Sequence, residues 1–346
     1  GVSYTCALKT DGTVYCWGDN YYGQLGDNTD NDKYTPVPVK GVGGEGYLTD
    51  ITQISAGGAN TCALKTNETI YCWGNNSGDN TTTNRHTPVQ VKEIKRKDFL
   101  TNISQVAAGG YHTCALKTDG TVYCWGYNYI GQLGDSTNDD RYIPIQVKGV
   151  GGEGYLTDIT QISAGVSYTC ALKTDGTVYC WGANYNGQLG DNTDVNRYTP
   201  VQVKGVNGKD YLTNVIQVAA GHNHTCVLKT NGAVYCWGEN DHGQLGDNTD
   251  TKKHIPVQVK GVEGKDFLTN VIQVAAGRYH TCALKTDGTV YCWGYNYMGQ
   301  LGDSTNVDRY TPVQVKGVEG KDFLTNISQV AAGHNHTCVL KTNGAV

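Results

Sequence analysis

Cysteine is the residue type with the clearest chemistry in this sequence, because twelve of its thirteen copies recur as pairs. The two members of a pair are ten residues apart and flank a turn such as Thr-Asp-Gly. If that turn is a three-residue loop with glycine in the left-handed conformation, the two cysteines face each other across a hairpin. Opposed Cβ atoms lie about 4.5–5.5 Å apart, and a non-hydrogen-bonded pair comes close enough for a disulfide. We therefore predict six disulfides: Cys6–Cys16, Cys62–Cys72, Cys114–Cys124, Cys170–Cys180, Cys226–Cys236 and Cys282–Cys292.

Metal binding and buried free thiols are the alternatives for these cysteines. Zinc sites favour cysteines two to four residues apart, so a spacing of ten is wrong for metal. Six disulfides would place the chain outside a reducing cytosol, in the extracellular space or at the cell surface. The partner of Cys338 would lie ten residues further on, beyond Val346. We expect Cys338 to be unpaired and the chain to be a window cut from a longer protein.

Histidine recurs at one position of the repeat. It also occurs in two His-x-His pairs, whose side chains could point to the same face of a strand and bind a metal. The shared position holds His112, His224, His280 and His336, and the pairs are His222/His224 and His334/His336. No carboxylate follows at a fixed spacing to complete a metal site. We therefore predict packing or hydrogen bonding for these histidines and no metal site.

Three loops rich in Asp and Asn, at residues 27–32, 135–140 and 191–196, offer oxygen ligands for calcium. The ligand order of an EF-hand is absent, and Asx turns explain these residues equally well. Calcium is the only cofactor left open. No nucleophile–base–acid set, phosphate-binding loop or zinc motif is present, so we predict that the chain is not an enzyme.

One repeated unit positions all these residues. The motif Cys-Ala/Val-Leu-Lys-Thr begins at each first cysteine and again at Cys338, with spacings of 56 residues and one of 52. The second repeat lacks four residues after Asn76, where the other repeats carry Gly-Gln-Leu-Gly. We treat 1–346 as a single repeat domain with repeats at 1–56, 57–108, 109–164, 165–220, 221–276, 277–332 and a partial one at 333–346.

Each repeat reads as about four short strands. In the fourth repeat these are residues 169–173, 177–181 after the Asp175-Gly176 turn, 200–204 with Pro200 at the first position, and 215–219. No segment has a helical period. Such units predict an all-β, antiparallel β-propeller, most simply with seven blades of which the seventh is incomplete, or alternatively six. A β-helix is the competing fold, but its rungs are shorter and lack tight hairpins.

The repeat also resembles a known family. The sequence Gly-x-x-His-Thr-Cys-Ala-Leu-Lys-Thr-Asp-Gly-Thr-Val-Tyr-Cys-Trp-Gly, followed by Asn-x-x-Gly-Gln-Leu-Gly-Asp, occurs at 109–135 and 277–303. It is similar to the regulator of chromosome condensation repeat. The resemblance implies a seven-bladed propeller in which Gly, Trp and Leu are structural. Family members range from a chromatin-bound nucleotide exchange factor to secreted inhibitors and bacterial surface proteins. An exchange-factor role is the least favoured of these functions, because this sequence has paired cysteines, an acidic net charge and no basic tail.

Sequence variation between the repeats is concentrated in two places, the tripeptide before Thr-Cys and the loop after Trp-Gly. The six tryptophans after the second cysteines could form a binding ring, but large flat side chains favour packing between blades. Equivalent loops of a propeller gather on one face, and Tyr-rich loops suit protein or glycan recognition. The alternative explanation for the variation is sequence drift in unconstrained loops. The predicted binding face contains Tyr4, Tyr21, Tyr22, His112, Tyr127, Tyr129, Tyr168, Tyr185, His224, Asp241, His242, His280, Tyr295 and Tyr297.

Composition narrows the function further. The net charge is −5 and no apolar run approaches the ~20 residues of a membrane helix, so neither nucleic acid binding nor membrane insertion is expected. We predict a non-enzymatic, extracellular or cell-surface propeller that binds a protein or glycan. The alternative is a structural subunit that pairs with copies of itself through open blade edges in a filament or array.

Overall fold

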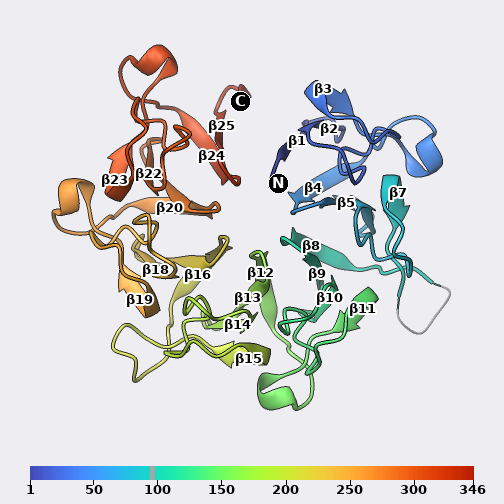
Figure 1. Cartoon of the computed structure of the whole chain (residues 1–346), viewed down its shortest axis with the longest axis horizontal. Helices are drawn as coiled ribbons and strands as arrows, with labels where there is room; N and C mark the ends of the chain where they lie inside the picture. Colours follow the sequence, from blue (N-terminus) through green and yellow to red (C-terminus); the bar gives the residue numbers. More distant parts are fainter. Residues whose placement is uncertain (94–97) are drawn as a thin grey trace. The chain divides into compact units, whose positions relative to one another are not determined.

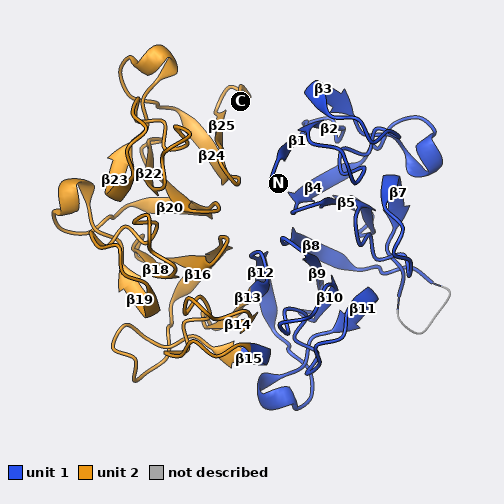
Figure 2. Cartoon of the chain, in the orientation of Figure 1, with its two compact units in different colours: residues 1–169, 197–200 blue, residues 170–196, 201–346 orange. Residues whose placement is uncertain are grey.

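The computed structural model describes residues 1–93 and 98–346, which form antiparallel β-sheets joined by turns and loops (Figure 1). The chain divides into two compact units (Figure 2). Unit 1 comprises residues 1–169 and 197–200, and unit 2 comprises residues 170–196 and 201–346.

Unit 1 contains the sheets β1-β2-β3, β4-β5-β6-β7 and β8-β9-β10-β11, and the strand β12. The bounds are β1 (Tyr4–Leu8), β2 (Val14–Gly18), β3 (Lys33–Pro38), β4 (Ile51–Ala56), β5 (Asn60–Lys65), β6 (Ile70–Gly74), β7 (Arg85–Gln90), β8 (Ile103–Ala108), β9 (His112–Lys117), β10 (Val122–Gly126), β11 (Arg141–Gln146) and β12 (Ile159–Ala164), with short 3-10 helices η1 (Val42–Gly44) and η2 (Val150–Gly152).

Unit 2 contains the sheets β16-β17-β18-β19, β20-β21-β22-β23 and β24-β25, and the strand β14. A further sheet has the order β12-β13-β14-β15. The bounds are β13 (Tyr168–Lys173), β14 (Val178–Gly182), β15 (Arg197–Gln202), β16 (Val215–Ala220), β17 (His224–Lys229), β18 (Val234–Gly238), β19 (Lys253–Gln258), β20 (Val271–Ala276), β21 (His280–Lys285), β22 (Val290–Gly294), β23 (Arg309–Gln314), β24 (Ile327–Ala332) and β25 (Thr337–Lys341), with η3 (Val262–Gly264) and η4 (Val318–Gly320).

The central hairpin of each sheet has the register that the sequence predicts. Lys9 donates its backbone N–H to the carbonyl of Thr13, which closes a three-residue turn, and Gly12 takes the left-handed conformation at φ 79°. Cys6 therefore faces Cys16. All six predicted pairs are disulfide-bonded, with Cα atoms 4.1 Å apart, and Cys338 is unpaired. The predicted disulfides are confirmed.

The sheets are offset from the sequence repeats by one strand. The segment predicted at 215–219 is β16, and it pairs with β17 of the next repeat rather than with the strands of its own repeat. The third strand also begins earlier than predicted, because Pro200 is the fourth residue of β15. β15 lies at a sheet edge, where the missing N–H of proline costs no ladder hydrogen bond.

This offset corrects the predicted number of blades in part. Within residues 1–93 and 98–346, five sheets have four strands, the sheet β1-β2-β3 has three, and β24-β25 has two. Four antiparallel strands per blade is confirmed, and the alternative of six blades fits the sheets. The prediction of seven blades is only partly right, since the seventh sheet has just two strands, β24 from the sixth repeat and β25 from the partial seventh.

In four of the sheets a tryptophan bonds to the preceding repeat. The indole N–H of Trp73 donates to the backbone carbonyl of Gln24 at 2.8 Å, and Trp237 does the same to Gln188 at 2.9 Å. The corresponding bonds run from Trp125 to Asn76 and from Trp293 to Gln244. These four indoles are fully buried, as is that of Trp181, whereas Trp17 is only partly buried. The packing interpretation of the tryptophans therefore holds.

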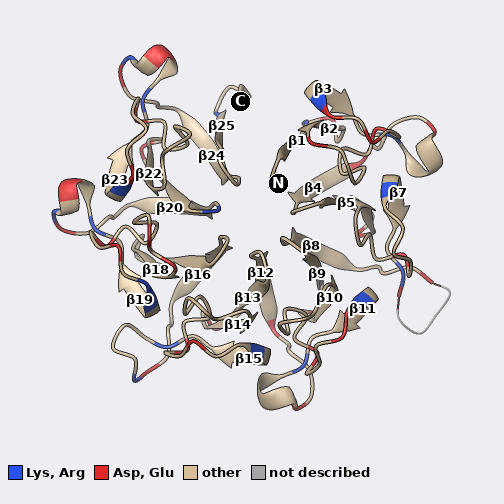
Figure 3. Ribbon diagram, viewed as in Figure 1, with Lys and Arg blue, Asp and Glu red and all other residues tan. Residues whose placement is uncertain are grey.

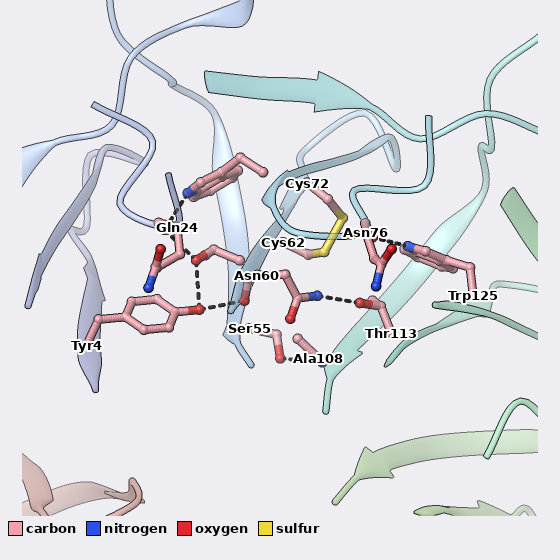
Figure 4. The surroundings of a disulfide bond; sticks show 12 residues. Tyr4, Gln24, Ser55, Asn60, Cys62, Cys72, Asn76, Ala108, Thr113 and Trp125 are labelled. Carbon is pink, nitrogen blue, oxygen red and sulfur yellow. Dashed lines mark hydrogen bonds between the residues drawn. A yellow bond between two sulfur atoms is a disulfide. The ribbon is translucent and has the colours of Figure 1, made fainter. Parts of the chain in front are cut away.

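The repeat position that holds His112 makes a second bond between neighbouring repeats. His112 Nε2 lies 2.7 Å from the hydroxyl of Thr169. The amide of Asn60 donates to the hydroxyl of Thr113 at the same distance (Figure 4). The pairs His224–Thr281 and His280–Thr337 repeat this contact at 2.9 Å. Tyr4 does so through its phenol, which contacts Thr61.

Burial keeps these histidines neutral. Desolvation lowers the pKa of His112, His224 and His280 to about 3 each. Below about pH 6.5 the unfolded chain binds a proton at each of them and the folded chain does not. The free energy of unfolding must therefore decrease as the pH falls from about 6.5 toward 3.

We expect this pH dependence to be weaker in the triple variant His112→Asn, His224→Asn, His280→Asn. Asparagine at position 60 shows that an amide can make the same bond to threonine. Each histidine should contribute on the order of 1 kcal/mol per pH unit within the window. Urea unfolding of both proteins between pH 7 and 4 measures the difference. The carboxylates titrate alike in the two proteins. Plots of the free energy of unfolding against pH that run parallel for the two proteins would therefore contradict the assignment of the pH dependence to these histidines.

Candidate binding surface

The predicted binding face separates into buried and exposed residues. Tyr4, His112, Tyr168, His224 and His280 are at most 2% exposed, so we correct their assignment to a binding face. All five residues are the first of a strand, and the side chains of Tyr4, His112, His224 and His280 make the threonine contacts described above. Of the others, Tyr21, Tyr22, Tyr127, Tyr129, Tyr185, Asp241 and Tyr297 are exposed, and His242 and Tyr295 are partly exposed.

The first aspartate of each Asp- and Asn-rich loop already has hydrogen-bond partners. In one loop, Asp135 Oδ1 accepts hydrogen bonds from the backbone and hydroxyl of Thr137 and from the amide of Asn128. Its Oδ2 pairs with Arg141 at 2.9 Å. Burial raises the pKa of Asp135, but the hydrogen bonds from Thr137 and Arg141 outweigh it and hold this pKa below its ordinary value. The Asx-turn interpretation accounts for this loop.

The same ion pair recurs along the chain. A lysine or arginine at the first residue of β3, β7, β11, β19 and β23 pairs with an aspartate six residues earlier (Figure 3). The basic side chain occupies the position where a bound cation would sit. Within the described residues no group of three or more His, Cys, Asp or Glu side chains is arranged to hold a metal.

Unit 2 carries a cluster of aromatic and charged side chains that we name the Arg278 surface: His222, Glu239, His242, Arg278, Tyr279, Tyr295, Tyr297 and Asp308. The guanidinium of Arg278 lies 4.5 Å from the ring centroid of Tyr279. The rings of His242 and Tyr295 are 4.6 Å apart, and His242 Nδ1 lies 2.9 Å from a carboxylate oxygen of Asp308. Cation–π and ring contacts of this kind hold side chains in place at a surface.

Several polar atoms of the Arg278 surface lack partners. Among the described residues, Arg278 Nε, Glu239 Oε2 and His222 Nδ1 are buried and make no hydrogen bond. Burial raises the pKa of Glu239. Burial and the neighbouring Arg278 lower the pKa of His222 to about 4. Unpaired buried polar groups cost free energy, because they have lost the hydrogen bonds that water makes to them in the unfolded chain.

Unit 1 carries a different cluster around a small pocket. Tyr22, Tyr111 and Tyr127 line it, together with Ala59, Asn60, Asn75, Asn76 and Gly110. The rings of Tyr111 and Tyr127 meet edge to face, with centroids 6.0 Å apart. No charged side chain is among these lining residues, so the two clusters differ in chemistry.

Sequence reasoning selected the wrong member of the variable tripeptide. The third residue, such as His112, is buried, and the second is the exposed one at Tyr111. The signal was present in the sequence. The third position is always a hydrogen-bonding Tyr, Asn or His, as a shared threonine partner requires, whereas the second position changes in size and chemistry, from Ala59 to Tyr279.

Comparison with known proteins places the chain in a family. The model of the RCC1-like domain matches residues 1–215, and that of the regulator of chromosome condensation (RCC1) repeat matches residues 231–284 and 287–340. The ultraviolet-B receptor UVR8 of Arabidopsis thaliana is 30% identical over 97% of this chain and 72% of its own length. The human E3 ubiquitin-protein ligase HERC2 is 29% identical over 97% of this chain, but the match spans only 7% of that protein.

Solved structures show the same fold. Prp20p of Saccharomyces cerevisiae superposes with a TM-score of 0.78 at 25% identity, over 98% of this chain and 80% of its own. Human WBSCR16 superposes with a TM-score of 0.79 at 24% identity, over 98% and 84% of the two chains. The chain therefore belongs to the RCC1 repeat family, and its four-stranded antiparallel sheets are blades of that family's β-propeller.

Proposed function

We propose that this chain is a non-enzymatic, extracellular or cell-surface binding protein that holds a protein or glycan through its loop side chains. The observation that carries the proposal is the Arg278 surface. Arginine and tyrosine dominate the binding energy of protein interfaces, and here they are ordered by ring contacts before any ligand arrives. Prp20p has described binding properties to Gsp1p and histones, which gives protein binding a precedent in the family.

An extracellular location is supported by the six disulfides, because such bonds persist in oxidising compartments. In the described part of the chain, no helix has the length and apolar character needed to cross a membrane. The net charge of −5 and the mixed charges of the Arg278 surface favour a partner with both charged and apolar groups over a polyanion.

We expect the double variant Arg278→Ala, Tyr295→Ala to lose at least tenfold in affinity for a partner captured from the medium or surface fraction of the source cells. Both side chains are partly exposed, so their removal should leave the fold intact. Tyr185→Ala is the matched control, since Tyr185 is exposed but outside the cluster. Biolayer interferometry against the purified partner measures the effect. Equal affinities for the double variant and the control would overturn the proposal.

Self-association is the second candidate, and one observation favours it. In unit 2, Leu301, Gly302, Val315 and Val339 line an open pocket. At the equivalent glycine of the preceding repeat, Gly246, a Cβ atom would lie 2.8 Å from the Trp293 indole nitrogen. At Gly302 it would meet only Val315. The pocket thus lies where other repeats hold an indole, and Trp17 is the tryptophan that is only partly buried.

Copies of the chain that associate by inserting Trp17 into this pocket would form filaments or arrays. We expect light scattering to show a molar mass that grows with concentration, and Trp17→Ala to abolish that growth. Tyr34→Ala, at an exposed residue of the same sheet, should leave assembly unchanged. A constant single-chain mass at all concentrations would exclude this candidate.

A further inference from the structure

The pocket in unit 1 owes its existence to the shortened second repeat. The Trp125 indole bonds the carbonyl of Asn76 as Trp73 bonds that of Gln24, so Asn76 is the equivalent of Gln24. The backbone N–H of Asn75 bonds the carbonyl of Ala59 as that of Asp19 bonds Ser3, so Asn75 is the equivalent of Asp19. The four missing residues therefore fall between Asn75 and Asn76, not after Asn76 as the sequence spacing suggested.

The missing residues correspond to Asn20-Tyr21-Tyr22-Gly23 of the first repeat. In that repeat the Asn20 amide bonds Asp27 and Thr29, and its carbonyl oxygen accepts the N–H of Leu25, which braces a projecting loop. The second repeat has no such loop. Its absence leaves a small hollow of about 100 Å³, flanked by Tyr22 of the first repeat and by Tyr111 and Tyr127 of the third.

The lining of this hollow combines aromatic rings with amides and carries no charge. Tyr22, Tyr111 and Tyr127 are 36%, 56% and 43% exposed, so their ring surfaces are available to a ligand. The Asn75 amide donates to Asn84 at 3.0 Å, which fixes its orientation and leaves its carbonyl oxygen free to accept. Asn60 also lines the hollow. Its amide donates to the hydroxyl of Thr113 (Figure 4).

This combination matches the chemistry of a neutral sugar. A pyranose ring has an apolar C–H face that packs on aromatic rings, and adjacent hydroxyls that pair with the donor and acceptor of an amide. A charged ligand would find no ion pair among the lining residues. A hollow of about 100 Å³ has room for part of a single small unit and not for an extended peptide.

We propose that this hollow is a binding site for one neutral sugar unit, such as a hexose or N-acetylhexosamine at the end of a glycan. The proposal rests on the binding function proposed above and names a ligand class for a second site, distinct from the Arg278 surface. The shortened loop of the second repeat creates the site, and Tyr111 and Tyr127 provide the packing surface.

The test uses the 346-residue chain made in a bacterial periplasm, where disulfides form and Asn75 carries no glycan. The probes are glucose, galactose, mannose, N-acetylglucosamine and N-acetylgalactosamine, each observed by saturation-transfer NMR, and a glycan array extends them to oligosaccharides. We expect at least one neutral sugar to bind, and the variants Tyr111→Ala and Tyr127→Ala to weaken that binding at least tenfold.

A loop-insertion variant gives a sharper check. Insertion of Asn-Tyr-Tyr-Gly between Asn75 and Asn76 restores the length of the first repeat, and we expect it to fill the hollow and abolish sugar binding. Tyr34→Ala, at an exposed tyrosine of unit 1 that does not line the hollow, is the matched control and should bind as the unaltered chain does. Since Tyr111 and Tyr127 are exposed, their variants remain informative even if the insertion fails to fold.

The sugar proposal is overturned if no neutral sugar binds, if sugar binding survives the insertion and the tyrosine variants, or if the hollow binds only peptides. Its failure is distinguishable from failure of the proposed function. The Arg278→Ala, Tyr295→Ala variant tests the Arg278 surface alone, and the insertion variant tests the hollow alone, so each can fail while the other stands.

Discussion

In three repeats one backbone carbonyl accepts two hydrogen bonds from the next repeat, and the arrangement of the sheets depends on these bonds. The carbonyl of Gln24 accepts both the Trp73 indole N–H at 2.8 Å and the Thr61 hydroxyl at 2.7 Å. The carbonyls of Gln188 and Gln244 accept the equivalent pairs. Both donors are buried, so loss of either hydrogen bond would leave a polar atom without a partner in an interior that excludes water. A Cβ atom at Gly26 would lie 2.8 Å from the Trp73 indole nitrogen, so glycine is needed there. The threonine and tryptophan donors and the glycine beside the indole therefore recur together in the repeats.

That constraint leaves the surface loops free to differ. The disulfide and the hydrogen bonds between neighbouring repeats hold the hairpin, whereas loop side chains such as Tyr21, Tyr129 and Tyr297 face solvent. In unit 1 the variable loops form a neutral hollow of tyrosine and asparagine. In unit 2 they form the Arg278 surface. Two ligand chemistries can thus be carried by repeats that share one scaffold, which is how a fold with many functions acquires a particular one.

The sequence predicted what depends on local spacing and failed where partners from a distant repeat decide. A ten-residue separation around a three-residue turn sets the facing of Cys6 and Cys16, so the disulfides followed directly. The segment at 215–219 was assigned to the wrong sheet because strand pairing across repeats carries no local signature. His112 was placed on the binding face because its threonine partner lies 57 residues away. The hollow could not be predicted, since it arises from residues missing between Asn75 and Asn76 and from the tyrosines on either side.

The account depends most on the indole bonds between repeats, and hydrogen exchange at the tryptophan indole N–H groups, followed by NMR, tests them most directly. The account predicts slow exchange, near the rate of global unfolding, for Trp73, Trp125, Trp237 and Trp293, and faster exchange for Trp17. Fast exchange at all of these indoles would mean that the repeats are not held together through buried indole bonds, and would contradict the account.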